Sequence, residues 1–284
     1  MKFDLNNYWL KSGLINIVQN ISGQILNLLS FYFLVRLLTK DEFGAWAIYM
    51  QTIVVFELIR NGLIQSALVK FLSGAEIKEH SKIVTAAFSI SSLITVICIV
   101  INLAFASYFS RLLNAPLLEP IFYMYNIVFL LSGLLTQLCC IEQANLQFKG
   151  VFASNVLRQF CMFIFPMYCY FFNREVSLEE LVWTQIVGVI LSLFGTWYFV
   201  KKFSHFKLSF DKLWIKKIYN YGKFSFGTSV SAQLSNTLDQ WMLAGLLSPA
   251  SSASFNIAVR ITNLINVPTD AVATIVFPQS SRRI

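Results

Sequence analysis

The sequence predicts an all-α membrane protein with several transmembrane helices, and composition and hydropathy are the observations that predict it. Of the 284 residues, 56% are hydrophobic and only 13% are charged, and the mean hydropathy is +0.63. A soluble domain carries about 25% charged residues, which solvate its surface. Apolar runs of about 20 residues recur along this chain, and each is long enough to cross a bilayer as a helix.

Eight apolar runs are expected to span the membrane, joined by short polar connections except after the sixth. They cover residues 13–38, 45–72, 83–109, 117–138, 156–172, 181–200, 222–247 and 252–277. Pro116 and Pro120 lie beside the start of the fourth run, and Pro249 lies between the seventh and the eighth, at positions where proline does not interrupt a helix. The first run is too long for a cleavable signal peptide, and no small-residue cleavage site follows it.

Positive charge is unevenly divided between the two sides of the membrane. The excess of 22 Lys+Arg over 14 Asp+Glu lies mainly before the first helix and in the even-numbered connections. The sixth connection carries six lysines, with Lys223 just beyond it, and one acidic residue, Asp211. Since cytoplasmic loops are enriched in Lys and Arg, the N-terminus and the even connections are predicted to be cytoplasmic. The net charge of +8 is explained by this topology, so no nucleic-acid partner is expected.

Residues 201–221 are predicted to form a basic cytoplasmic linker. Its second half has apolar side chains at helical spacing, namely Phe210, Leu213, Trp214, Ile218 and Tyr221. A helix with such a stripe, and with lysines beside it, would lie in the membrane interface against anionic lipid. An ordinary basic loop is an equal alternative for the first half of the linker.

The seventh helix repeats the first. An offset of 209 residues pairs Ser22 with Ser231, Gln24 with Gln233 and Asn27 with Asn236. The offset spans six helices, an even number, so both copies enter the membrane from the same side and the repeat is parallel. The sequence therefore predicts a first six-helix bundle over residues 1–200 and the start of a second bundle over residues 222–284.

The repeat also bears on the length of the chain. A complete second copy would end near residue 418, about twice the offset of a parallel repeat. We therefore expect the 284-residue sequence to be a fragment or a truncated product, with a natural eight-helix protein as the alternative.

Matching polar stripes mark the two related helices. They consist of Asn16, Asn20, Gln24 and Asn27 on the first helix and of Ser225, Ser229, Gln233 and Asn236 on the seventh. Polar side chains in hydrocarbon are costly unless they face protein or water. The matched pair of stripes favours the walls of a shared aqueous cavity, and interhelical hydrogen bonding is the alternative.

Charged residues also fall inside the expected helices. Glu57 and Arg60 are three residues apart and can pair with each other. Arg158 lies near the cytoplasmic start of the fifth helix, where it can extend to the membrane surface. Asp239 and Arg260 lie about 12 Å deep in the two helices of the outer hairpin, so they can form an ion pair.

A further acidic residue, Asp270, follows Pro268, whose kink would free backbone carbonyls beside a carboxylate that could hold a cation or a proton. Glu57, Asp239 and Asp270 are therefore candidates for ion coupling. Arg60 and Arg260 would suit an anionic cargo if they face a cavity, because guanidinium binds phosphate oxygens through two parallel hydrogen bonds.

Nothing in the sequence points to catalysis. The cysteines, Cys98, Cys139, Cys140, Cys161 and Cys169, lie in or beside apolar runs, and none forms a CxxC pair. With two histidines in the chain, no metal-ligand cluster is expected, and no phosphate-binding loop of the ATPase type is present. We expect a transporter that is not an enzyme and that needs no cofactor and no metal.

Several short motifs recur in order along the chain. They are Leu37–Gly44, Arg60–Leu63, Leu238–Asp239, Ala258–Ile261, Pro268 and Phe277–Ser280. Together these loose motifs resemble those of bacterial polysaccharide flippases, and the resemblance covers the whole chain. Such flippases move O-antigen and other lipid-linked oligosaccharides and are related to the multidrug and toxin extrusion transporters. In that family two six-helix bundles alternate between inward-open and outward-open states around a central cavity, which the first and seventh helices line.

The resemblance implies a cargo, a place and partners. The cargo would be a polyprenyl-diphosphate-linked oligosaccharide, flipped across the bacterial cytoplasmic membrane and coupled to an ion gradient. Membrane lipids, a polysaccharide polymerase and the export machinery would be the partners. The cavity residues would include Asn16, Asn20, Gln24, Asn27, Arg60, Gln233, Asn236 and Arg260.

Three other functions remain open. A drug or cation antiporter of the same fold would need a cavity with net acidic walls, which Arg60 and Arg260 oppose if they face it. A membrane-bound glycan polymerase or acyltransferase would need a large polar loop with catalytic groups. A truncated product without transport activity is the last alternative.

Overall fold

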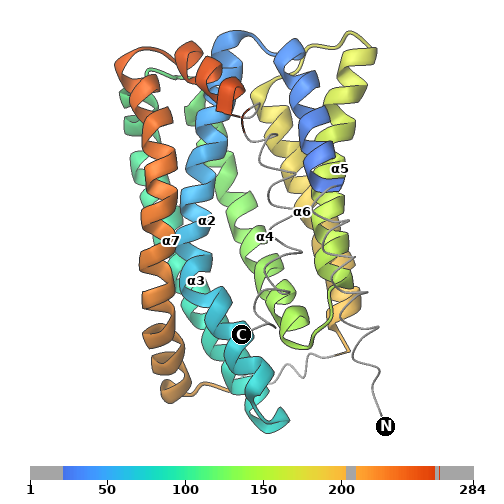
Figure 1. Ribbon diagram of the computed structural model, residues 1–284, viewed down its shortest axis with the longest axis vertical. Helices are drawn as coiled ribbons and strands as arrows, with labels where there is room; N and C mark the ends of the chain where they lie inside the picture. The colour runs from blue at the N-terminus through green and yellow to red at the C-terminus, as the bar shows by residue number, and fades with distance from the viewer. Residues whose placement is uncertain (1–21, 203–208, 260–261, 263–284) are drawn as a thin grey trace, which may run out of the picture.

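The computed structural model describes residues 22–202, 209–259 and 262, and this part of the chain contains helices and no strand. Its long helices are α2 (Lys40–Gly74), α3 (Ile77–Leu112), α4 (Leu118–Ala144), α5 (Lys149–Phe171), α6 (Leu178–Val200) and α7 (Lys212–Leu246). A helical segment at residues 22–37 precedes them, and another at residues 249–259 follows them. The helices run up and down beside one another, as an all-α bundle requires (Figure 1).

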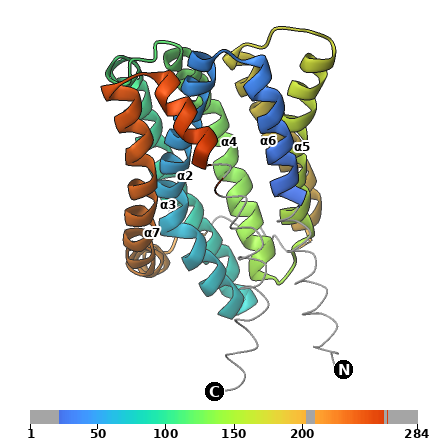
Figure 2. The same cartoon turned by 45° about the horizontal axis from the view of Figure 1, so that its top comes forward.

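Helix α4 lies between two groups of helices. On one side α2 packs against both α3 and α7, and on the other α5 packs against α6. Helix α4 contacts α2, α3, α5 and α6, so it is shared by both groups. The tilted view shows the same order, with segment 22–37 beside α5 and α6 (Figure 2).

Five helices, α2 to α6, are long and apolar enough to cross a membrane. This confirms the predicted class of an all-α polytopic membrane protein. Helices α2 and α5 begin earlier than hydropathy alone indicates, at Lys40 and Lys149, because each is extended by residues that precede its apolar run.

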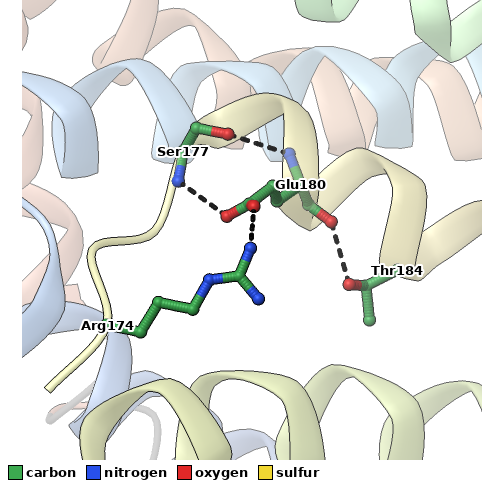
Figure 3. Close-up of polar contacts among 4 residues, drawn as sticks. All are labelled: Arg174, Ser177, Glu180 and Thr184. Atoms are coloured by element: carbon green, nitrogen blue, oxygen red, sulfur yellow. Dashed lines mark hydrogen bonds and ion pairs between the residues drawn. The ribbon is translucent and has the colours of Figure 1, made fainter. Parts of the chain in front are cut away.

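Side chains at the helix starts explain these boundaries. At α6, the Ser177 hydroxyl accepts a hydrogen bond from the Glu180 N–H, and the Glu180 carboxylate accepts one from the Ser177 N–H. Arg174 adds an ion pair to Glu180 at 2.6 Å, and the Thr184 hydroxyl donates to the Glu180 carbonyl (Figure 3). Thr39 and Glu42 form the same reciprocal pair at the start of α2.

Helix α5 lacks a capping side chain of its own, and α4 supplies one. The Glu142 carboxylate, near the end of α4, accepts hydrogen bonds of 2.8 Å from the N–H groups of Gly150 and Val151. These are unpaired donors in the first turn of α5, where the helix dipole also favours a negative charge. Glu142 is only 1% exposed, and a Cβ on Gly150 would overlap its Oε2 atom.

Three helices end in a residue with left-handed backbone geometry. Asn114 follows α3 with a φ of 52°, Leu146 follows α4 with 56°, and Asn173 follows α5 with 49°. A left-handed residue at this position reverses the chain and lets its N–H groups bond the last carbonyls of the helix. Asparagine tolerates this geometry, and it occupies two of the three positions.

Helix α7 differs from the expected linker followed by a separate membrane helix. It is one helix from Lys212 to Leu246 and passes through residue 222 without a break. Trp214 and Ile218, which were expected to face lipid, are buried in an apolar cluster with Leu68 and Leu72 of α2. These two side chains of the apolar stripe therefore pack against α2, whereas Phe210 and Leu213 are exposed.

Small residues bring α2 and its neighbours close together. A Cβ on Gly222 of α7 would overlap the backbone carbonyl of Leu63, and a Cβ on Gly44 would overlap that of Pro249. Two polar contacts cross the same interface, where Gln51 donates to the Thr237 hydroxyl at 2.9 Å and the Trp241 indole donates to the Thr52 hydroxyl at 3.2 Å. Close backbone packing with interhelical hydrogen bonds is typical of membrane helices.

Candidate functional site

A polar pocket of about 290 Å³ lies inside the bundle and is lined by segment 22–37, α2, α4, α5 and α6. Its apolar walls include Trp46, Met50 and Met162. Its polar lining consists of Asn27, Ser30, Glu57, Ser132, Asn155, Arg158, Gln159 and Gln185. Binding pockets are typically lined by apolar side chains with a few polar groups. This pocket has such a lining and also holds one acidic residue, Glu57, and one basic residue, Arg158.

Helix α5 contributes three of the eight polar residues, more than any other helix. Asn155, Arg158, Gln159 and Met162 follow one another at i, i+3, i+4 and i+7, so they share one face of the helix. Arg158 donates from Nη2 to the Asn155 side-chain oxygen at 2.8 Å. The buried Arg158 Nε and Gln159 Oε1 have no hydrogen-bond partner among the described residues. One free donor and one free acceptor are therefore available to a bound group.

Glu57 supplies the negative charge. It lies in the middle of α2, half-buried, and its carboxylate makes no hydrogen bond or ion pair with the described residues. An unpaired carboxylate at this depth of a membrane helix is costly unless it meets water, a cation or a proton. Glu57 lines the polar pocket, so the pocket is the place where such a partner could reach it.

Arg60, one turn further along α2, is bound elsewhere. It is fully buried and donates to the Phe129 carbonyl (2.5 Å), the Ser132 hydroxyl (3.2 Å) and the Asn61 side chain (3.1 Å). Its guanidinium also lies 4.3 Å from the centre of the Phe129 ring. Arg60 therefore bonds to neutral acceptors and not to Glu57, the partner expected from the sequence. Arg60 does not line the polar pocket itself, but its partner Ser132 does.

Glycines allow the helices around the pocket to approach. A Cβ on Gly133 of α4 would lie 3.0 Å from Arg60 Nη1, and a Cβ on Gly23 would lie 2.6 Å from Gln159 Oε1. Gln185 of α6 is held in place by the Tyr49 hydroxyl, which donates to it at 2.9 Å. The polar groups of the pocket are thus fixed from several helices.

Size limits what the polar pocket can hold. Pockets for drug-sized ligands measure about 300–1,000 Å³, and this one lies at the lower bound. It suits a hydrated ion, a proton relay or one polar group of a larger molecule. No group of three or more potential metal-ligating side chains occurs within the described ranges.

The expected cavity residues fall in different places. Asn27 lines the polar pocket, while Gln24 of the same segment is exposed and does not line it. Gln233 lies in α7, outside this pocket, and donates within its own helix to Thr237. Asn236 belongs to α7, but its side chain lies outside the described structure, as do Asn16, Asn20 and Arg260.

The expected ion-coupling residues separate in the same way. Glu57 lines the polar pocket, whereas Asp239 is exposed and lines an apolar depression with Met242 and Phe255. Asp270 and the partner expected for Asp239, Arg260, lie outside the described residues.

Sequence reasoning missed part of the pocket. Asn155, Gln159 and Gln185 were not selected, and Arg158 was interpreted as extending to the membrane surface. The helical spacing of Asn155, Arg158 and Gln159 was a usable signal, because it places three polar groups on one face of an apolar helix. Gln185 stands alone in α6, so only the fold connects it to the others.

Comparison with protein families gives one match. A family model described as polysaccharide biosynthesis protein matches residues 33–283. No curated protein and no solved structure matches the chain. The match includes every helix from α2 to α7 and all residues of the polar pocket except Asn27, Ser30 and Phe31. This multi-pass membrane protein belongs to the polysaccharide biosynthesis protein family.

Proposed function

We propose that this protein flips a polyprenyl-diphosphate-linked oligosaccharide across the bacterial cytoplasmic membrane by alternating access, for the synthesis of a surface polysaccharide. The family match supports the pathway. The observation that carries the transport role is the polar pocket, which places Glu57 and Arg158 inside a bundle of membrane-spanning helices. Buried charges of this kind mark ion or substrate pathways.

The polar pocket and the cargo have different sizes, so we assign them different roles. A pocket of about 290 Å³ cannot enclose an oligosaccharide. We assign the cargo to a cavity between the first bundle and a second bundle that begins with α7. The polar pocket then serves ion coupling, with Glu57 as the group that binds a proton or a cation and Arg158 as its charge counterpart. Asp239, Asp270 and Arg260 remain candidates in the second bundle.

The test is deletion of the gene with analysis of lipid extracts and surface glycan. We expect lipid-linked oligosaccharide to accumulate and surface glycan to be lost, and the wild-type gene to restore both. Unchanged lipids and glycan would contradict the proposal.

Complementation with variants tests the assignment of the polar pocket. Glu57→Gln removes the charge with little change of volume, and we expect it to reduce export at least about tenfold, the equivalent of 1.4 kcal/mol. Glu175→Gln is the matched control, because Glu175 is exposed in the connection between α5 and α6. Full export by Glu57→Gln would remove ion coupling from this pocket.

One observation favours a second function. The Glu57 carboxylate, which has no partner within the described ranges, could bind an organic cation, as in an ion-coupled drug antiporter. Drug susceptibility of the deletion strain separates the two functions, since greater susceptibility with normal lipids and glycan would support the antiporter.

A further inference from the structure

An aromatic cluster joins α2 to α7 at one end of the bundle. The Phe71 ring of α2 lies 5.8 Å from Trp214 and 5.7 Å from Tyr221, measured between ring centres, and both pairs meet edge to face. Trp214 and Tyr221 are seven residues apart, so they lie two turns apart on one face of α7. Phe71 therefore contacts both α7 rings from α2.

Two lysine side chains rest on this cluster. The Lys70 ammonium lies 4.1 Å from the centre of the Tyr221 ring, and the Lys217 ammonium lies 4.3 Å from that of Trp214. A cation over an aromatic face is attracted to it, which restricts a side chain that otherwise has much rotational freedom. The two ammonium groups, one from each helix, are therefore partly fixed in place.

Neither ammonium group is neutralised. Both side chains are exposed, and neither ammonium makes a hydrogen bond or an ion pair with the described residues. The nearby acid Asp211 is engaged otherwise, because it accepts a hydrogen bond from the Leu213 N–H and pairs with Lys82 at 3.4 Å. These contacts hold the pKa of Asp211 below its usual range, so it remains a carboxylate committed to Lys82.

The position of the lysines along the helices corresponds to the membrane surface. Helix α2 has 35 residues and is therefore about 52 Å long, against about 30 Å for the hydrocarbon core. Lys70 lies in the last turns of α2, and Lys217 lies in the second turn of α7. Lysine excess assigns this end to the cytoplasm, where lipid phosphates lie at the same depth.

We propose that Lys70 and Lys217, held on the Tyr221 and Trp214 rings, form a binding site for the phosphate group of a membrane lipid. Lysine binds phosphate as a point charge and has three N–H donors, and among the described residues none of these donors has a hydrogen-bond acceptor. The phosphate can come from the diphosphate of the cargo or from an anionic phospholipid. The first source rests on the proposed function, whereas the second does not.

The experiment uses the full chain in nanodiscs and compares two double variants. Lys70→Gln with Lys217→Gln removes the two fixed charges. The matched control, Lys212→Gln with Lys216→Gln, removes two exposed lysines of α7 that lie outside the aromatic cluster. Tyr221→Leu keeps both charges and removes one ring. Farnesyl diphosphate, a short polyprenyl diphosphate, is the first probe, in discs of phosphatidylcholine.

For a cargo site, we expect the first double variant to weaken farnesyl diphosphate binding roughly 25-fold, from two lysines contributing about 1 kcal/mol each. The control should change binding less than about twofold, and Tyr221→Leu should weaken it severalfold. For a phospholipid site, we expect all variants to bind farnesyl diphosphate as the wild type does. Native mass spectrometry of protein from phosphatidylglycerol discs should then show fewer retained lipids than in the wild type. This loss should appear only in the first double variant and in Tyr221→Leu.

Equal losses in both double variants would overturn the proposal in favour of a diffuse surface charge, and so would no loss in either assay. Binding is measured without transport, so failure here leaves the result of the gene deletion unaffected.

Discussion

Arg60 shows how a charge is accommodated in the middle of a membrane helix. Burying an ion is costly unless its polar atoms are satisfied. Here three neutral acceptors and the Phe129 ring take the place of a carboxylate. The side chain thereby ties α2 to α4, while Glu57 is left free to face the polar pocket.

Arg60→Ala should lower stability as well as activity. The change removes three hydrogen bonds and leaves a cavity between α2 and α4, so we expect a loss of about 2–4 kcal/mol. The midpoint of thermal unfolding of the detergent-purified protein measures it. Arg111→Ala, at an exposed site in the last turn of α3, is the control and should change the midpoint little. A normal midpoint with lost export would instead assign Arg60 to the cargo.

At the scale of the element, the start of α5 depends on its neighbour. The Glu142 carboxylate of α4 accepts hydrogen bonds from two N–H groups of the first turn, and Gly150 leaves room for the carboxylate. Local side chains can mark a helix start in a sequence, and Thr39 and Ser177 do so here, although hydropathy placed these two starts several residues later. Sequence inspection could not find the start of α5, because the capping group comes from another helix.

A double-mutant cycle tests this cap. We expect Glu142→Ala to lower the unfolding free energy by about 1–3 kcal/mol, since buried donors lose their acceptor. Gly150→Ala should be destabilising in the wild type, where the new Cβ meets the carboxylate. In the Glu142→Ala background the same change should be neutral or stabilise by up to about 1 kcal/mol, as alanine favours helix. Thermal unfolding of the four proteins measures the coupling, and additive effects would refute the cap.

At the scale of the whole molecule, the sequence specified the helices better than their packing. Apolar run length predicted α2 to α6, because hydropathy reports directly on the bilayer. The stripe of Trp214 and Ile218 was also found, but the sequence does not say whether an apolar stripe meets lipid or protein. Of the residues that line the polar pocket, the sequence analysis identified Glu57 and Asn27 as candidates. It did not identify Gln185, because only the packing of α6 places that residue beside the others.

The contact between α2 and α7 can be tested by cross-linking. Gln51→Cys with Thr237→Cys, in a background without the five native cysteines, should be joined by a short bifunctional thiol reagent, since the native side chains are hydrogen-bonded at 2.9 Å. Gel mobility after proteolysis between the two sites measures the link. Gln51→Cys with Leu246→Cys, at the far end of α7, is the control and should not be joined. Absence of the first link would contradict this packing.

The close approach of Gly222 to Leu63 also restricts how a lipid can reach the interior of the molecule. With the two backbones in contact, and with Gln51 and Thr52 bonded to α7 further along, no side chain or hydrocarbon chain fits between α2 and α7 at these points. In this state the seam between α2 and α7 is closed at these points. A lipid that enters the interior from the bilayer at these points can do so only after α2 and α7 have separated. Otherwise it must enter elsewhere.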